Sequence, residues 1–372
     1  MGKQAVYYQE LEGTSREIGR QMGRCPGAEK MSFPAPENFS KEIFEEAFRL
    51  YEAWCPGITE EVAGFSEVTG IPVENIAFSW MTYLLPRCSG LILTGNKTAD
   101  GHARIIRNYE YSVEGEDLKL CRTAPKGRYA HLSGTIVEFG RCEGINEKGL
   151  AVSMSSCGFP VGNMPFMRAP KIKGLQFWAV IRGLLENCAD VAEALKRAAA
   201  MPIAYNINLY LADAKGHGVL FETMDGEKAW KYITPEDGEQ YLCGTNHIAI
   251  PEFREKEPAG MRNSIVRYQA LDHFAREKEV REEEELRRFF LEDYPKGMSA
   301  HFYKDGFGTI KTVVLDTVEK RYSICWLGLE ENGWEDYLLE KKYGDCVREK
   351  EYREEQGRME FFEFVPIPER DE

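Results

Sequence analysis

Near the start of the chain, hydrophobic residues recur at three- and four-residue spacing, which is typical of an amphipathic helix. They are Phe44, Ala47, Phe48, Tyr51 and Trp54. Pro56-Gly57 ends this pattern, a second helix is expected over 59–69 before Gly70, and a third begins near Pro72. We therefore predict that residues 1–87 are mostly helical and that their aromatic stripes pack into a core.

From Cys88 onward, short apolar runs alternate with turn signals. Asp100-Gly101 suits a tight hairpin, so strands over 89–94 and 102–108 are expected to pair. Further strands are predicted at 129–139, 150–156, 206–212, 218–223, 310–315 and 322–326, with helices at 175–186, 190–200, 263–276 and 282–291. Grouped strands followed by grouped helices favour a layered α+β fold over a doubly wound parallel sheet.

Charge excludes some partners. The chain has 372 residues with 47 Lys plus Arg and 61 Asp plus Glu, a net charge of −14. Such a chain repels phosphates, so nucleic acid and anionic membranes are not expected partners. No apolar run is long enough to span a membrane and the start lacks a signal-peptide core, which predicts a cytoplasmic protein. The charged stretches 276–288 and 330–372 are expected to be solvated helix faces.

Most common catalytic motifs are missing from the sequence. Its six histidines form no metal-binding motif, and it has no P-loop, no G-x-G-x-x-G and no G-x-S-x-G. We therefore expect neither a metal ion nor a cofactor. The ten cysteines include no C-x-x-C pair, so in a reducing compartment they should be free thiols, mostly buried.

Cys88 differs from the other cysteines in its position. It opens the first strand after the helical segment, and Arg107 and Glu110 follow on the return strand of the hairpin. A nearby arginine lowers a thiol pKa and favours the thiolate. The plainer interpretation is a buried thiol beside a structural ion pair, and spacing alone leaves both open.

Five motifs, in order, resemble a known group of enzymes. They are Cys88-Ser89 with 98–102 and Arg107-Asn108, then Gly144 to Ala151, Gly244 to His247, Asn263 to Tyr268, and Thr309 to Leu315. Together they resemble N-terminal-nucleophile (Ntn) amidohydrolases, and most of all the isopenicillin-N acyltransferase-like family of cysteine peptidases and acyltransferases. Choloylglycine hydrolases and penicillin V acylases are more distant relatives. The resemblance covers residues 40 to 330.

The resemblance implies a four-layer αββα sandwich in which residues 1–87 are a helical prosegment and 88–372 the catalytic domain. It also implies self-cleavage between Arg87 and Cys88, with the two fragments remaining as a heterodimer. The new α-amino group, with a pKa near 8, could accept the thiol proton, which an amide nitrogen cannot do. The expected substrate is a linear N-acyl amide, attacked to form an acyl-thioester that passes to water or to an acceptor amine.

Site residues are implied in the same way. Arg107 would stabilise the thiolate, and Asn246 would donate its amide N–H to the oxyanion. Arg267 would bridge the charges of the site, although a helix-face salt bridge is nearly as good an interpretation. Glu110 holds the position where the family usually has Asp, Arg87 replaces a small residue, and Ser156 stands where choloylglycine relatives carry Asn.

Two other functions stay open at this stage. Cys88 could pair with His247 in a papain-like hydrolase that needs no cleavage. Alternatively, the chain could be an uncleaved member that only binds acyl compounds, with Arg87 and Glu110 marking lost activity. The pocket walls are expected around Phe159 to Phe166 and Tyr205, and the identity of the acyl amide does not follow from the sequence.

Overall fold

The computed structural model describes residues 1–26, 28, 33, 40–80, 87–158 and 168–368. Its helices are α1 (Ser15–Gly23), α2 (Lys41–Trp54), α3 (Ile58–Thr69), α4 (Val73–Trp80), α5 (Phe177–Asn187), α6 (Val191–Ala200), α7 (Pro251–Arg254), α8 (Arg262–Glu277) and α9 (Glu283–Leu291). Strands of the first half are β1 (Gly2–Gly13), β2 (Arg87–Leu93), β3 (Arg104–Tyr111), β4 (Lys119–Pro125), β5 (His131–Ile136), β6 (Gly140–Asn146) and β7 (Ala151–Ser156). Those of the second half are β8 (Ile207–Ala212), β9 (Gly218–Met224), β10 (Glu227–Ile233), β11 (Tyr241–Gly244), β12 (Ala259–Met261), β13 (His301–Phe302), β14 (Phe307–Asp316), β15 (Arg321–Trp326), β16 (Trp334–Leu338), β17 (Cys346–Tyr352) and β18 (Phe364–Pro366).

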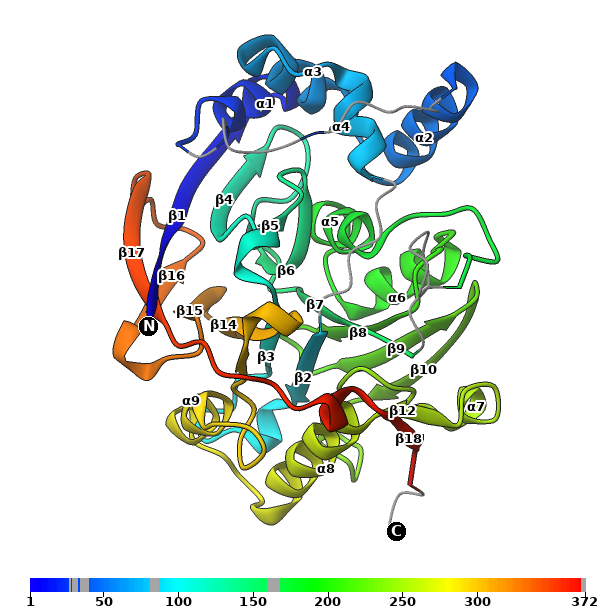
Figure 1. Cartoon of the computed structure of the whole chain (residues 1–372), viewed down its shortest axis with the longest axis vertical. Coiled ribbons are helices and arrows are strands. Elements are labelled where there is room, and N and C mark those ends of the chain that lie inside the picture. Colours follow the sequence, from blue (N-terminus) through cyan, green and yellow to red (C-terminus); the bar gives the residue numbers. More distant parts are fainter. Residues whose placement is uncertain (27, 29–32, 34–39, 81–86, 159–167, 369–372) are drawn as a thin grey trace.

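Two large sheets organise these strands (Figure 1). The larger has the order β10-β9-β8-β7-β6-β5-β4-β1-β17, and the smaller has the order β11-β2-β3-β14-β15-β16 with β13 beside β14. Every pairing is antiparallel except that of β1 with β4. This mainly antiparallel arrangement confirms the prediction of an α+β fold over a doubly wound parallel sheet.

The two sheets face each other. Strands β2 and β3 of the smaller sheet lie against β7 and β8 of the larger one. Helices α5 and α6 pack on the larger sheet, whereas α8 and α9 pack on the smaller one. Strands covered on both faces bury every residue, as β8 and β14 do. Figure 1 shows α1 to α4 grouped at one end of the molecule and α8 and α9 at the other.

The prediction that the first 87 residues are mostly helical is wrong at their start. Residues 2–13 form β1, which lies inside the larger sheet between β4 and β17. Val6, Tyr8 and Leu11 of this strand are buried in the main core. A strand is stabilised by its neighbours, and these neighbours lie more than a hundred residues away, at 119–125 and 346–352.

The charged tail is also not a helix face. Residues 330–372 contain β16, β17 and β18, and β17 forms the edge of the larger sheet. Charged side chains are common on edge strands because one side meets water. The other charged stretch does include helix, since α8 ends at Glu277 and α9 begins at Glu283.

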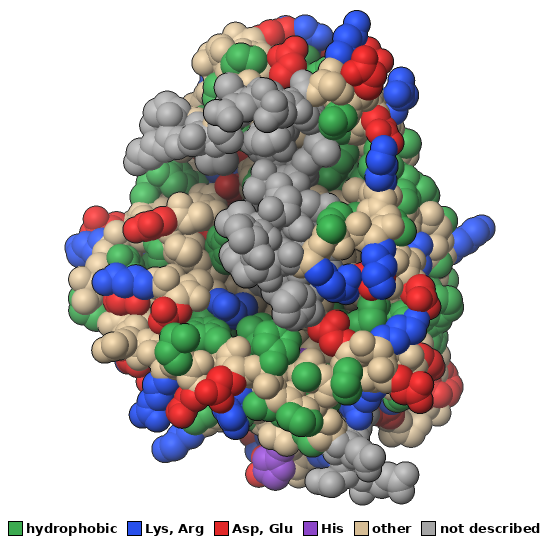
Figure 2. Space-filling model, turned by 45° about the vertical axis from the view of Figure 1, so that its right-hand side comes forward, with side chains coloured by type: hydrophobic (Ala, Val, Ile, Leu, Met, Phe, Trp, Pro, Cys, Tyr) green, Lys and Arg blue, Asp and Glu red, His purple; other side chains and the backbone are tan. Residues whose placement is uncertain are grey.

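Several local predictions hold. Helices α2 and α3 lie where the spacing indicated, and Gly70 ends α3 with φ of +72°. The Asp190 side chain caps α6. Strands β4 and β6 were not predicted. In the described part of the chain, no helix is both long and apolar enough to cross a membrane. On the face seen in Figure 2, acidic and basic side chains are interspersed over the described residues.

Candidate active site

Cys88 lies in β2, and the hairpin with β3 decides what surrounds it. Cys88 pairs with Tyr109, and Gly90 pairs with Arg107. Residues directly opposite in an antiparallel pair share a face, so the Arg107 side chain lies on the same face as Cys88. At Gly90 a Cβ would lie 2.9 Å from the ring of Tyr210, so glycine is what lets Tyr210 pack there. The sequence prediction that Arg107 stands beside Cys88 is therefore consistent with the register.

The Cys88 sulfur is buried and faces a cation. Arg107 Nη2 donates to Cys88 Sγ at 2.9 Å, and the side chains of both residues are fully buried. Burial raises the pKa of the Cys88 thiol to about 12, while Arg107 and the backbone N–H of Glu110 act to lower it. In the intact chain Cys88 is therefore a protonated thiol in contact with the Arg107 guanidinium.

Arg267, from α8, connects the remaining groups. Its Nη1 donates to the Cys88 carbonyl oxygen at 3.0 Å and to Glu110 Oε2 at 3.3 Å, and its Nη2 donates to Asn246 Oδ1 at 2.6 Å. Asn263 Oδ1, one helical turn earlier, accepts from the same Nη2 at 2.9 Å. Arg267 is thus aimed into the site and is not an exposed helix-face salt bridge.

Asn246 lies where β11 stops pairing with β2. Because β11 ends at Gly244, the Cys88 N–H has no strand partner on that side and donates to Asn246 Oδ1 at 3.2 Å. Asn246 Nδ2 donates to the carbonyl oxygen of Ser156 at 3.0 Å and to its Oγ at 3.1 Å. Ser156, the departure from the choloylglycine pattern, therefore lies in direct contact with Asn246.

The Glu110 carboxylate is buried on the other face of β3. Burial raises the pKa of Glu110 to about 7, although Arg267, Arg107 and Arg87 act to lower it. Its Oε2 contacts Arg267, whereas its Oε1 has no hydrogen-bond partner among the described residues. A buried oxygen without a partner is costly, so this site has unused capacity to accept a donor.

A further set of charged residues lies between the sheets behind Arg107. Glu143 of β6 contacts Arg107 Nη1 through Oε2 at 2.7 Å, and its Oε1 contacts Lys311 Nζ of β14 at 2.9 Å. Tyr322 of β15 donates its hydroxyl to the same Oε1 at 2.7 Å. Sequence reasoning missed these residues. A signal was present, because Glu143 and Lys311 are charges in the interior of the strands 140–146 and 307–316, which are otherwise largely apolar or neutral.

His247 has no contact with the sulfur among the described residues. Its Nδ1 lies 2.8 Å from Ser264 Oγ and 3.2 Å from Thr245 Oγ1, and Ser264 Oγ also accepts the Asn246 backbone N–H at 2.7 Å. Burial lowers the pKa of His247 to about 3, with Arg254 and Arg267 acting in the same direction. His247 is therefore a neutral ring that helps hold the Asn246 segment.

Arg87, on the other side of the candidate cleavage bond, is anchored by later parts of the chain. Its Nη1 donates to the carbonyl oxygens of Asp305 at 2.8 Å and Gly306 at 2.6 Å. The guanidinium also lies over the Phe362 ring, with 4.7 Å from Cζ to the ring centroid. The segment before Arg87, residues 81–86, lies outside the described residues.

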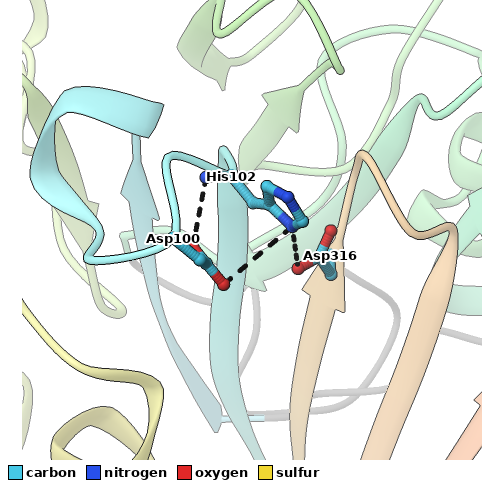
Figure 3. Close-up of side chains that lie close together, drawn as sticks. All are labelled: Asp100, His102 and Asp316. Carbon is cyan, nitrogen blue, oxygen red and sulfur yellow. Dashed lines mark hydrogen bonds and ion pairs between the residues drawn. The ribbon is translucent and has the colours of Figure 1, made fainter.

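One group of side chains has the composition of a metal site. Asp100, His102 and Asp316 lie together at the end of β3 that is remote from Cys88 (Figure 3), and His102 Nδ1 is 3.0 Å from Asp316 Oδ2. Arg104 Nη2 already pairs with Asp100 at 2.5 Å and with Asp316 at 3.1 Å. An arginine that supplies the counter-charge makes this an ion-pair cluster and not a cation site.

The expected pocket walls can be tested only in part. Phe159 to Phe166 fall in the range 159–167, which lies outside the described residues. Tyr205 is buried, and its pKa is raised first by burial and then by the nearby Cys88 sulfur, so it does lie close to the candidate nucleophile.

Comparisons with known proteins identify the family of the chain. The model of the acyl-coenzyme A:6-aminopenicillanic acid acyl-transferase family matches residues 97–329, which include Arg107, Glu110, Asn246 and Arg267 but not Cys88. None of the curated proteins compared with the chain matches it.

Among solved structures, a mutant of the conjugated bile acid hydrolase from Clostridium perfringens is 12% identical over 73% of this chain and 98% of its own, with a TM-score of 0.42. Penicillin V acylase from Agrobacterium tumefaciens is 17% identical over 73% of this chain and 84% of its own, with a TM-score of 0.40.

Proposed function

Since the chain belongs to the acyl-coenzyme A:6-aminopenicillanic acid acyl-transferase family, we propose that it is an amidohydrolase or acyltransferase that cleaves a linear N-acyl amide. Cys88 is the nucleophile. The observation that carries the proposal is the meeting of Arg107, Glu110, Asn246 and Arg267 around Cys88, from three separate parts of the chain.

Self-cleavage comes first in this proposal. The Cys88 sulfur attacks the Arg87 carbonyl carbon, the C–N bond breaks, and the proton of the thiol passes to the departing nitrogen. Water then hydrolyses the resulting thioester, which leaves a carboxylate on Arg87 and a free thiol and α-amine on Cys88. Before this step the buried thiol, with its raised pKa, is held inactive, as in a zymogen.

The free amine then serves as the general base. It takes the thiol proton, the thiolate attacks the amide carbonyl of the substrate, and the leaving amine receives that proton back. The acyl group remains on sulfur until water or an acceptor amine removes it. Arg107 stabilises the thiolate. When substrate binds, Asn246 Nδ2 turns from Ser156 to the oxyanion and donates to it together with the Ser156 hydroxyl.

Glu110 receives the new α-ammonium group. An amine carries more protons than an amide nitrogen, and these need an acceptor in a buried site. The unpartnered Oε1 of Glu110 supports this role. Glu110 thereby takes the part that an aspartate has in related enzymes, with one additional methylene of reach.

The proposal also covers the overall architecture. The two facing sheets, with α5 and α6 on one side and α8 and α9 on the other, support a four-layer αββα sandwich. Residues 1–87 are then a prosegment that stays bound as one subunit, and 88–372 are the catalytic subunit. Ten free cysteines suit a reducing compartment such as the cytoplasm.

The experiment is a mass measurement of the acylated enzyme. Purified protein is incubated with a panel of N-acyl amides (penicillins, bile-salt conjugates, N-acyl amino acids and fatty amides) and quenched in acid. We expect one fragment, beginning at Cys88, to gain the mass of one acyl group. The variant Cys88→Ala should gain none, and the matched control Cys325→Ala, which removes another buried thiol, should behave as wild type.

The same experiment separates the alternatives. A papain-like enzyme would be acylated without cleavage and would lose acylation in His247→Ala. A protein that only binds acyl compounds would bind members of the panel without forming a thioester, and Cys88 would show no selective alkylation by iodoacetamide.

A further inference from the structure

Three charged side chains contact one another in series behind the Cys88 sulfur. Arg107 contacts the sulfur at 2.9 Å, Glu143 contacts Arg107 at 2.7 Å, and Lys311 contacts Glu143 at 2.9 Å. Each is at most 2% exposed. They come from β3, β6 and β14, so this series of contacts crosses from the smaller sheet to the larger one and back.

All three groups are charged at neutral pH. Burial acts to raise the pKa of the Glu143 carboxyl, but Lys311 and Arg107 hold that pKa below its usual value. Burial acts to lower the pKa of Lys311, but Cys142 and Glu143 raise it overall. The neighbouring Glu116 carboxyl is different, because burial raises its pKa to about 8 and leaves it mostly protonated.

The sum of these charges matters for the sulfur. Glu143 carries the opposite charge to Arg107, so without Lys311 it would offset part of the attraction that Arg107 exerts on a thiolate. With Lys311 included, the three side chains carry a net charge of plus one. Lys311 Nζ also donates to Cys142 Sγ at 3.1 Å, which fixes it in place.

We infer that Lys311 is a positioning residue for catalysis: it neutralises Glu143, so that Arg107 keeps a net positive charge for the Cys88 thiolate. Glu143 in turn holds the Arg107 guanidinium toward the sulfur. This inference rests on the proposed function only in taking Cys88 as the nucleophile.

Other charged and titratable groups also face Cys88 and Lys311. Around Cys88 they are Glu110 of β3, Arg267 of α8, and the tyrosines Tyr109, Tyr205 and Tyr210. Around Lys311 they are Glu116, Tyr109 and Cys142, and Tyr322 donates to the Glu143 oxygen that Lys311 contacts. All of them are retained in the variants below, so differences between variants report on the altered pair.

The test is a titration of the Cys88 thiol by the ultraviolet absorbance of its thiolate. Each variant is compared with the same variant carrying Cys88→Ala, and the difference isolates one thiol among ten and cancels the tyrosines. Intact mass identifies the form of each sample, and only Cys88-containing variants in the same form, cleaved or uncleaved, are compared with one another. The Cys88→Ala partners, which stay intact, serve only to subtract the absorbance of the other thiols and the tyrosines. The variants are Lys311→Met, Glu143→Gln and the double variant, with Lys304→Met as an exposed-lysine control.

Net charge predicts the order of the thiol pKa values. Lys311→Met leaves a neutral pair and should raise the thiol pKa by about one unit, whereas Glu143→Gln leaves two cations and should lower it by a similar amount. The double variant restores a net charge of plus one and should return the pKa to that of wild type. Lys304→Met should change nothing.

A merely structural role predicts another order. If the double variant differs from wild type more than either single variant does, or if Glu143→Gln raises the thiol pKa, the inference is wrong. If Lys311→Met does not fold because Glu143 has lost one of its two cations, the thiol pKa values of Glu143→Gln and the double variant still test the inference. The titration needs no substrate, so its outcome is independent of whether N-acyl amides prove to be substrates.

Discussion

The nitrogen and the sulfur of Cys88 are held by different residues. The N–H donates to Asn246 Oδ1, whereas the sulfur accepts from Arg107. Cleavage of the preceding bond changes the nitrogen from an amide to an amine without requiring either partner to move. The intact chain thus already holds the groups that the proposed reaction needs.

Asn246 should matter for the rate of acyl transfer. Asn246→Ala removes an oxyanion donor and should lower kcat by about 10²–10³-fold. The measurement is single-turnover acylation of Cys88 with saturating substrate. Asn187→Ala, which removes an asparagine side chain that donates to the Gly183 carbonyl oxygen within α5, is the control and should keep the wild-type rate. An equal effect in both variants would contradict the assignment.

Glu110 should make stability depend on pH. Its pKa is raised by burial from 4.5 to about 7, so the folded chain holds a proton that the unfolded chain has lost. The contribution of this group to stability is fully present below about pH 4.5 and is lost as pH rises through about 7. Relative to Glu110→Gln, we expect the free energy of unfolding to fall by about 3 kcal/mol at most over that range.

Urea unfolding from pH 4.5 to 7.5 measures this difference. Both proteins carry Cys88→Ala, which keeps the chain intact so that one molecule unfolds. If the free energies of unfolding of the two proteins changed with pH in parallel, the pKa of Glu110 would be the same in the folded and unfolded chain, which would contradict this prediction.

The sequence contained part of this site. The places of Arg107 and Glu110 follow from the hairpin, because its register puts Arg107 on the same face as Cys88 and Glu110 opposite Arg87. Asn246 and Arg267 came only from the family resemblance, since their place beside Cys88 depends on how β11 and α8 pack on β2. The contact between Glu143 and Lys311 could not be predicted from the sequence, because these residues meet where the two sheets face each other.

At the scale of elements, β1 changes the picture most. Its pattern is only partly alternating, and the described residues that follow it offer no strand as a local partner, so the sequence favoured helix by association with 44–80. Strand pairing with 119–125 and 346–352 overrides that preference. The segment that we propose to be cut from the catalytic subunit is therefore also part of the larger sheet.

Truncating a buried side chain of β1 should destabilise the fold. Leu11 is 0% exposed, and Leu11→Ala should lower the free energy of unfolding by about 2–5 kcal/mol. The control is Glu12→Ala on the same strand, which loses an exposed ion pair with Lys342 that water screens, so its effect should be small. Urea unfolding of both variants in the intact Cys88→Ala chain tests this. Equal small losses would show that β1 packs loosely.

At the scale of the whole molecule, the position of β1 predicts what happens after cleavage. Residues 1–87 contribute a strand between β4 and β17, and α1 packs on both β1 and α3. The fragments should therefore elute together in gel filtration and separate only in denaturant. Dissociation of 1–87 in native buffer, with the catalytic fragment still folded, would contradict this.

The layered arrangement could be predicted from the grouping of strands and helices, whereas the order of strands in each sheet could not. Neighbours such as β1 with β17 or β3 with β14 are far apart along the chain, and nothing in their local patterns identifies the partner. The C-terminal strands were missed for the same reason.

The most direct test of the account is the intact mass of purified, active protein. We predict two masses, one ending at Arg87 and one beginning at Cys88, whose sum is the mass of the full chain plus one water. Cys88→Ala should give a single full-length mass and no acyl transfer. A wild-type protein that hydrolyses N-acyl amides while remaining one uncut chain would contradict the central claim.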